Sequence, residues 1–237
     1  MTLVRSLVFS LWLYLSMPLF AILLSPALLG PHQWAMGVIR AWARFILFGL
    51  RWIVGIRVEV RGLEHRPTGA ALVAAKHQSM LDVVAPFTFL DNPCFVMKKE
   101  LMPLPFFGWF AWKTRMIPVD RAAHAKALKD MVRNTRERLV DDRQIVIFPE
   151  GTRTRPGQPG DYKPGVAAIY RDVSVPCHLL ATNSGQHWPA KGVTGFRPGT
   201  VVFEFLPPVE ASLKRIEFMK QMESRIETTS TALLLPR

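Results

Sequence analysis

The sequence predicts an α/β fold, in which a central sheet is covered by helices and follows an N-terminal membrane-embedded helical segment. Between residues 56 and 206, short apolar or alternating runs typical of strands take turns with longer runs typical of helices. Before them, residues 6–39 contain no Lys, Arg, Asp or Glu. These observations divide the chain near residue 52, into a membrane-associated helical segment (1–51) and an α/β domain (52–237).

The uncharged segment is longer than the roughly 20 apolar residues that one membrane-spanning helix needs. Pro18, Pro26 and Pro31 interrupt it, and proline kinks or ends a helix because it lacks a backbone donor. Two interpretations follow. One is a single kinked span over about residues 6–28. The other is a pair of shorter helices, hinged near Pro26–Pro31, that enter one leaflet and return.

Basic residues are more frequent after the uncharged segment than before it. Arg5 precedes the segment, and the arginines that follow are Arg40, Arg44, Arg51, Arg57 and Arg61. The more basic side of a membrane segment is expected to be cytoplasmic. Residues 38–54 carry arginines on one side and aromatic residues elsewhere, which predicts a helix lying in the membrane interface. Ala41-Trp42-Ala43 has the form of a signal-peptide cleavage site, but the apolar region is too long, so we expect no cleavage.

The rest of the chain is read from its hydrophobic periodicity and from its glycines and prolines. The predicted strands are 56–61, 69–75, 94–98, 144–148, 175–181 and 200–206. The predicted helices are 79–90, 122–140, 164–171 and about 209–232. Alternation of this kind indicates a sheet with helices packed on it.

Composition narrows the possible partners and sites. The formal net charge of +12 suits anionic partners such as nucleic acid, anionic lipid or acidic carriers. The two cysteines, Cys94 and Cys177, lie in apolar surroundings without metal-ligand spacing. We therefore expect two buried free thiols and no metal site.

The stretch KHQSMLD, residues 76–82, follows a predicted strand. In an unbroken α-helix His77 and Asp82 would point about 140° apart, so they can meet only across a turn. Ser79-x-x-Asp82 has the form of a capping box, which would supply that turn. The pair is then either a general base with its orienting carboxylate or an ordinary helix cap.

A second polar segment, IFPEGTRTR (147–155), follows another predicted strand. Gly151 lets the backbone approach a ligand, and the guanidinium groups of Arg153 and Arg155 suit phosphate. Two shorter motifs, VMKKEL with Lys98 and MIPVDR with Arg121, add further cations. Each of these motifs alone would usually be solvated surface charge.

In chain order, His-x-x-x-x-Asp, KKEL, IPVDR, FPEGTR and a following Val-Pro strand resemble the lysophospholipid acyltransferase family. Its best-known members are the 1-acylglycerol-3-phosphate acyltransferases. The resemblance covers about residues 56–206, and the ordered set is far more specific than any one motif. It implies a glycerol-phosphate acyltransferase-like fold with a central mixed sheet. Lys76 departs from the Asn of many members, although lysine also occurs there in bacterial members, some of which use a different lysolipid.

The resemblance further implies a reaction and its residues. His77 would be the general base and Asp82 would orient it. The positions that match the acceptor-binding residues of the family are Lys98, Arg121, Glu150, Gly151, Thr152 and Arg153. The reaction implied is acyl transfer from acyl-CoA or acyl-ACP to 1-acylglycerol-3-phosphate, giving phosphatidic acid. We expect no metal or other cofactor, no nucleic-acid partner, and a place in a bacterial inner membrane with the catalytic domain facing the cytoplasm.

Three further expectations stay open. The acceptor could be another lysolipid, such as a lyso-ornithine lipid. The chain could instead be a non-enzymatic basic membrane protein, which would explain its charge but not its motifs. The apolar segment 101–112 could hold an acyl chain, meet the bilayer or belong to the core.

Overall fold

The computed structural model describes residues 2–173, 175–210 and 212–234. Its centre is a seven-stranded sheet with the order β1-β7-β6-β2-β5-β3-β4. The strands are β1 Ile56–Arg61, β2 Ala71–Ala75, β3 Pro93–Lys98, β4 Ile117–Val119, β5 Gln144–Ile147, β6 Cys177–Thr182 and β7 Gly199–Val209. Neighbours are parallel except β6 and β7, so the sheet is mixed, as predicted.

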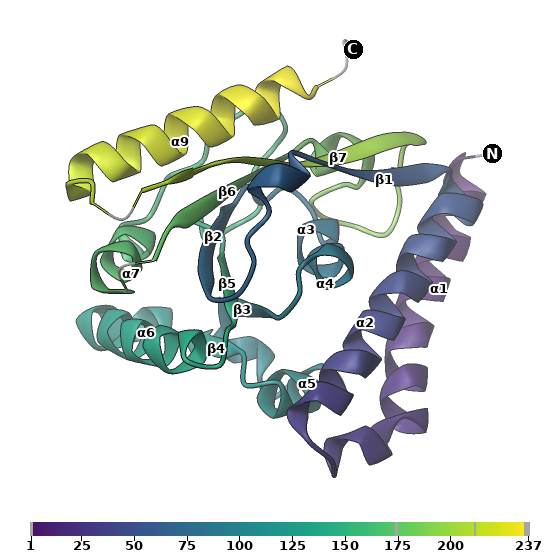
Figure 1. The fold of residues 1–237 in the computed structure, drawn as a ribbon. Coiled ribbons are helices and arrows are strands. Elements are labelled where there is room, and N and C mark those ends of the chain that lie inside the picture. The colour runs from purple at the N-terminus through teal and green to yellow at the C-terminus, as the bar shows by residue number, and fades with distance from the viewer. Residues whose placement is uncertain (1, 174, 211, 235–237) are drawn as a thin grey trace.

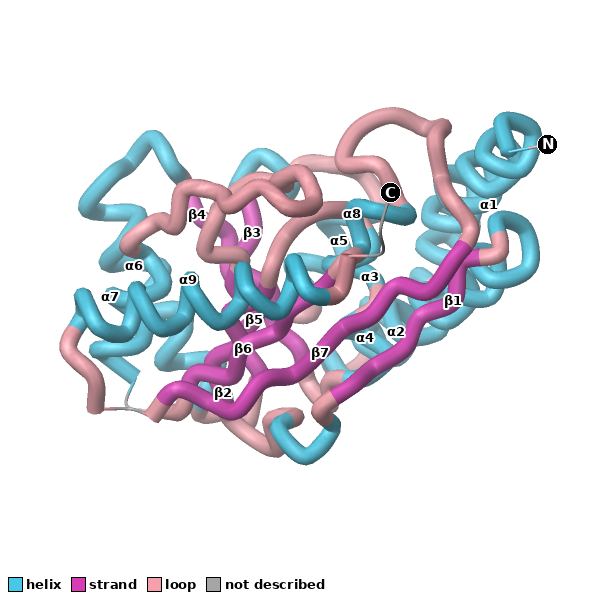
Figure 2. Tube along the Cα trace, turned by 90° about the horizontal axis from the view of Figure 1, so that it is seen from above, coloured by secondary structure: helices cyan, strands magenta, loops and turns pink. Residues whose placement is uncertain are grey.

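Helices cover both faces of the sheet (Figure 1). They are α1 Thr2–Leu23, α2 His32–Gly49, α3 Leu81–Val84, α4 Pro86–Phe89, α5 Phe107–Lys113, α6 His124–Leu139, α7 Gly165–Val173, α8 Ser184–His187 and α9 Arg215–Ala232. Helices α6, α7 and α9 form one layer, in which α9 crosses β6 and β7 (Figure 2). Helix α2 packs against α4 and α5 on the other side. This arrangement confirms the predicted fold class.

All six predicted strands are present, and two differences concern short elements. The single helix predicted over 79–90 is two short helices, α3 and α4, because Pro86 opens α4 and cannot continue the hydrogen bonding of α3. Strand β4 and helices α5 and α8 were not predicted. All three are too short for their periodicity to be seen in the sequence.

The N-terminal segment is a helical hairpin. Helices α1 and α2 lie side by side, joined across a 3₁₀ turn at Ser25–Leu28, with Pro26 in the turn and Pro31 just before α2 (Figure 1). The two-helix interpretation therefore describes the chain better than a single kinked helix. Helix α2 begins earlier than the predicted amphipathic helix 38–54, and residues Leu50–Val54 continue from it as a π-helix.

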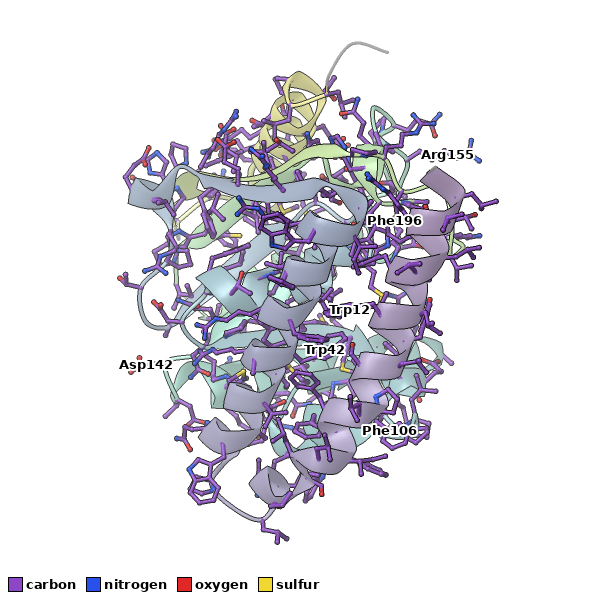
Figure 3. All side chains as sticks on the ribbon, turned by 90° about the vertical axis from the view of Figure 1, so that its right-hand side faces the viewer. Trp12, Trp42, Phe106, Asp142, Arg155 and Phe196 are labelled. Atoms are coloured by element: carbon purple, nitrogen blue, oxygen red, sulfur yellow. The ribbon has the colours of Figure 1, made fainter. Side chains whose placement is uncertain are left out.

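Aromatic side chains hold the hairpin together. Trp12 and Trp42 lie between the two helices (Figure 3), and Trp12 stacks on Phe45 with ring centroids 4.2 Å apart. Gly49 makes room for this packing, because a Cβ there would come within 2.5 Å of Trp12 Nε1. Phe9 of α1 belongs to the same buried cluster as the strands of the sheet. The hairpin is thus packed on the α/β unit, and the boundary near residue 52 stays a prediction.

The outer face of α1 is apolar and unprotected. Leu7, Leu11, Leu15 and Ile22 are each about half exposed, at 48%, 60%, 59% and 56%. Residues Leu3–Leu23 form a helix that is long and apolar enough to cross a membrane, by length and composition only. An apolar face of this size favours contact with a membrane rather than with water.

Candidate active site

The site begins where β2 ends. Strands β2 and β5 are parallel neighbours, so the segments that follow them, 76–82 and 148–155, emerge at the same edge of the sheet. The carboxyl ends of strands are where α/β proteins commonly bind ligands. The order of the strands, which is not visible in the sequence, therefore brings the two polar motifs together.

His77 and Asp82 meet across the turn between β2 and α3. Asp82 Oδ2 lies 3.2 Å from His77 Nδ1 and accepts hydrogen bonds from the backbone N–H groups of Gln78 (2.6 Å) and Ser79 (2.7 Å). The Asp82 side chain is buried. Because a carboxylate only accepts, Nδ1 carries the proton and Nε2 is the basic nitrogen of the neutral ring. This is the geometry of a base with an orienting carboxylate.

The helix cap predicted at Ser79 is realised only in part, because the N-cap of α3 is Met80 and makes no side-chain cap hydrogen bond. Ser79 Oγ accepts a hydrogen bond from the N–H of Leu81 at 3.1 Å, and Asp82 accepts one from the N–H of Ser79. Ser79 therefore lies one residue before the N-cap, and its hydroxyl binds the N–H of Leu81 instead of the N–H of Asp82 that a capping box uses. Asp82 itself fixes the turn by accepting from two of its backbone N–H groups, and the same carboxylate contacts His77.

The His77 ring is fixed on its face as well as at its edge. Phe148 stacks on it, with centroids 4.0 Å apart and an angle of 16° between the planes. The His77 side chain is 13% exposed, and Nε2 makes no hydrogen bond with any described residue. Phe148 was not among the predicted site residues. Its position directly after a buried strand, in the segment that converges on His77, was the available signal.

Glu150 lies behind the turn rather than in front of it. Its carboxylate is buried and accepts from the N–H of His77 (3.0 Å), the hydroxyl of Thr154 (2.8 Å) and the Lys76 ammonium (2.7 Å). Thr154 completes the connection by donating its N–H to the carbonyl of His77 at 2.9 Å. The carboxylate thus joins the two segments, and to contact an acceptor it would have to leave these partners.

The cations of the predicted acceptor site occupy the more open side. Arg121 donates to the carbonyl of Gly151 at 2.6 Å, and Gly151 has the positive φ of 65° that glycine adopts easily. Arg153 donates to the carbonyl of Ala190 at 2.9 Å. Both arginines are exposed. The structure therefore brings Arg121 and Gly151 together and leaves both guanidinium groups within reach of solvent.

Two other predicted positions are less constrained. Lys98, the last residue of β3, is exposed, and its side chain makes no hydrogen bond or ion pair with the described residues. Thr152 is exposed as well. Lys76, the position that departs from the family pattern, is only 1% exposed. Its ammonium therefore faces the interior and does not itself contact a bound acceptor.

A small cavity of about 80 Å³ adjoins the site, walled by Ser10, Leu13 and Tyr14 of α1, by Met80 and Arg153, and by the loop 188–196. A larger open groove of about 390 Å³ lies at the tip of the hairpin, lined by Leu28, Met102, Gly108, Trp109 and Trp112. Only the small cavity includes residues of the two polar segments. The wall contributed by α1 connects the site to the apolar N-terminal helix.

The two cysteine thiols and the Tyr162 hydroxyl are made unreactive by burial. Cys94 and Cys177 are buried free thiols, as predicted, and burial raises the pKa of both, that of Cys177 to about 12. The pKa of Tyr162 is raised by burial and by the neighbouring Glu227 and Glu150. Among the described residues, no group of three His, Cys, Asp or Glu is arranged to hold a metal ion.

Comparisons with known proteins agree with this geometry. A family model described as Acyltransferase matches residues 57–181. The 1-acyl-sn-glycerol-3-phosphate acyltransferase of Pseudomonas aeruginosa is 34% identical over 190 residues, which cover 80% of this chain and 74% of that protein. The human 1-acyl-sn-glycerol-3-phosphate acyltransferase alpha is 31% identical over 168 residues, 70% of this chain but 59% of the human protein.

The fold has a match among solved structures. The 1-acyl-sn-glycerophosphate acyltransferase of Thermotoga maritima superposes with a TM-score of 0.80 over the full length of both chains, at 22% identity. At that identity the likeness concerns the fold. The family model and the Pseudomonas relative concern the sequence itself, and together they show that the chain belongs to the acyltransferase family.

Proposed function

We propose that the chain transfers an acyl group from an acyl thioester to the free hydroxyl of 1-acylglycerol-3-phosphate, giving phosphatidic acid. The proposal rests on the His77 ring, which is oriented by Asp82 and stacked on Phe148. The ring lies beside residues 148–155 (the Arg153 segment). The names of the relatives indicate the acceptor.

In the proposed step, His77 Nε2 takes the proton of the acceptor hydroxyl while the oxygen attacks the thioester carbonyl. The tetrahedral intermediate then expels the thiolate, which receives the proton from the imidazolium and leaves as a thiol. Asp82 stabilises the imidazolium between these two transfers. No enzyme nucleophile and no cofactor beyond the acyl donor take part.

The acceptor phosphate is assigned to the open side of the site, where Arg121 and Arg153 are exposed and Lys98 lies at the end of a neighbouring strand. One guanidinium group can donate two parallel hydrogen bonds to two oxygens of the same phosphate. Gly151 and Thr152 add a flexible backbone and a hydroxyl to the same segment. Glu150 supports this site from behind, through His77 and Thr154.

The acyl chains are assigned to the membrane side. The exposed face of α1 would lie in the bilayer, and the exposed Trp109 and Trp112 of α5 extend the apolar surface near the tip of the hairpin. We place the protein in a bacterial inner membrane with the site facing the cytoplasm, where acyl-CoA and acyl-ACP are found. Both donors are acidic and suit the net charge of +12.

A thiol-release assay with purified protein tests the proposal. It crosses acyl-CoA and acyl-ACP with 1-acylglycerol-3-phosphate, a lyso-ornithine lipid and acceptors without phosphate. We expect thiol release and phosphatidic acid with the first acceptor. No release with that acceptor and either donor would refute the proposal. Salt-sensitive nucleic-acid binding without thiol release would favour a non-enzymatic role instead.

A further inference from the structure

A largely buried cluster of charges lies directly behind residues 76–82 (the His77 turn). Lys76 Nζ donates to Glu150 Oε1 at 2.7 Å and to Glu227 Oε1 of helix α9 at 2.6 Å. The side chains of Lys76 and Glu150 are 1% and 0% exposed, and that of Glu227 is 18% exposed. One ammonium group therefore faces two carboxyl groups away from most of the solvent.

The cluster joins three segments that are distant in the sequence. Lys76 begins the His77 turn, Glu150 belongs to the Arg153 segment (148–155), and Glu227 belongs to α9. Tyr162 lies beyond the segment 148–155, next to Lys163, whose N–H binds the carbonyl of Pro149, and it also donates its hydroxyl to Glu227 Oε1, at 2.9 Å. Through one oxygen atom Glu227 thus contacts the first polar segment directly and the loop that follows the second, from a helix that carries none of the motifs.

This arrangement depends on the lysine at position 76. An asparagine at position 76 would be uncharged and too short to reach both carboxyl groups. With lysine, the buried Glu150 and the partly buried Glu227 share a counter-charge, and buried charges are retained only when they are paired. Removing one partner of a buried pair is far more damaging than removing both.

We propose that Lys76 and Glu227 are a positioning pair for the proposed acyl transfer, through which α9 holds the His77 turn and the Arg153 segment in register. Neither side chain touches the substrates. Lys76 acts through Glu150, which binds the N–H of His77. The inference rests on the proposed function and adds to it a role for the C-terminal helix.

The first test replaces Glu227 by Gln, which keeps the shape but removes the charge. We expect kcat to fall about tenfold with the acceptor KM nearly unchanged, because a misplaced base slows the chemical step. The matched control is Glu217→Gln. Glu217 lies in the first turn of α9, is exposed, and its side chain contacts Gln221 at 3.5 Å rather than the cluster. The control should keep the kcat of the unaltered protein.

Tyr162→Phe removes one hydroxyl from the same oxygen and should lower kcat by about twofold to threefold. A purely structural role predicts a different result. It would lower the thermal midpoint of Glu227→Gln while leaving kcat unchanged at a temperature where both proteins are folded. That result would overturn the proposal.

The second test is a double-mutant cycle. Lys76→Asn leaves the buried Glu150 and the partly buried Glu227 without a counter-charge, so we expect kcat to fall about a hundredfold. Adding Glu227→Gln to Lys76→Asn should recover about tenfold of that loss. A double variant no more active than Lys76→Asn would overturn the pairing. If the unaltered protein acylates only another lysolipid, the proposed function fails, and the same cycle run with that acceptor still tests the pair.

Discussion

The His77 turn is polar and largely buried, whereas the outer face of the α1–α2 hairpin is apolar and exposed. In the turn, Asp82 accepts from two backbone N–H groups and contacts the His77 ring, with little exposed surface. On the hairpin, Leu11 and Leu15 expose more than half of their surface, with no protein group over them. Asp82 Oδ2 finds its partners within the turn, although Asp82 Oδ1 and Gln78 Nε2 have none among the described residues, whereas the hairpin face requires an apolar environment. Chemistry and membrane attachment should therefore be separable by mutation.

The largest expected effect is that of His77→Ala. Removing the base should lower kcat by about 10²–10⁴-fold, the usual contribution of a positioned general base. Binding to vesicles should not change, because the hairpin is untouched. Thiol release and vesicle flotation are measured on the same preparation. Substantial activity in folded His77→Ala would remove His77 from the mechanism.

Asp82→Asn should come next. It keeps the size of the side chain but replaces the carboxylate that faces His77 Nδ1 and two backbone donors, so we expect kcat to fall about a hundredfold. Loss of a charged hydrogen-bond acceptor should also lower the free energy of unfolding by about 1.5–3 kcal/mol. Chemical denaturation and kinetics check the two effects. The control is Asp91→Asn, an exposed aspartate paired with Arg66, and equal losses in both variants would contradict an orienting role.

Arg153→Ala tests whether this side chain binds the phosphate of the acceptor. A lost charged hydrogen bond to phosphate, worth about 1.5–3 kcal/mol, corresponds to an increase of about tenfold to a hundredfold in the acceptor KM. The kcat at saturating acceptor should change little. Initial rates over a range of acceptor concentrations distinguish the two parameters. A lower kcat with an unaltered acceptor KM would argue against phosphate binding by Arg153.

Leu11→Glu addresses the hairpin. A charge on the apolar face should weaken binding to vesicles about tenfold or more, since burial of a leucine side chain contributes about 1.5–3 kcal/mol. Thiol release with a short-chain, water-soluble acceptor should be unaffected. Val140→Glu, at an exposed position after α6, is the control and should leave vesicle binding unchanged. Unaltered vesicle binding by Leu11→Glu would show that α1 does not face the membrane.

Much of the fold follows from local patterns. The buried strands are visible as short apolar runs, and the hinge of the hairpin follows from Pro26 and Pro31, which cannot continue a helix. Strand β4 was missed because three residues carry no periodicity. The turn between His77 and Asp82 was predicted from Ser79 and Asp82, but its N-cap is Met80, and the turn is held by the Asp82 carboxylate rather than by a Ser79 cap.

The fold class, the two polar motifs, the His77 turn and the apolar N-terminal segment were predictable from the sequence, since each depends on residues close together in the chain. The contacts between groups far apart in the chain were not predictable. Phe148 stacks on His77, Glu150 turns inward, and Lys76 reaches Glu227, 151 residues away in the sequence. These contacts depend on the strand order and on where α9 crosses the sheet. No local pattern specifies either one, because both are set by the packing of the whole core.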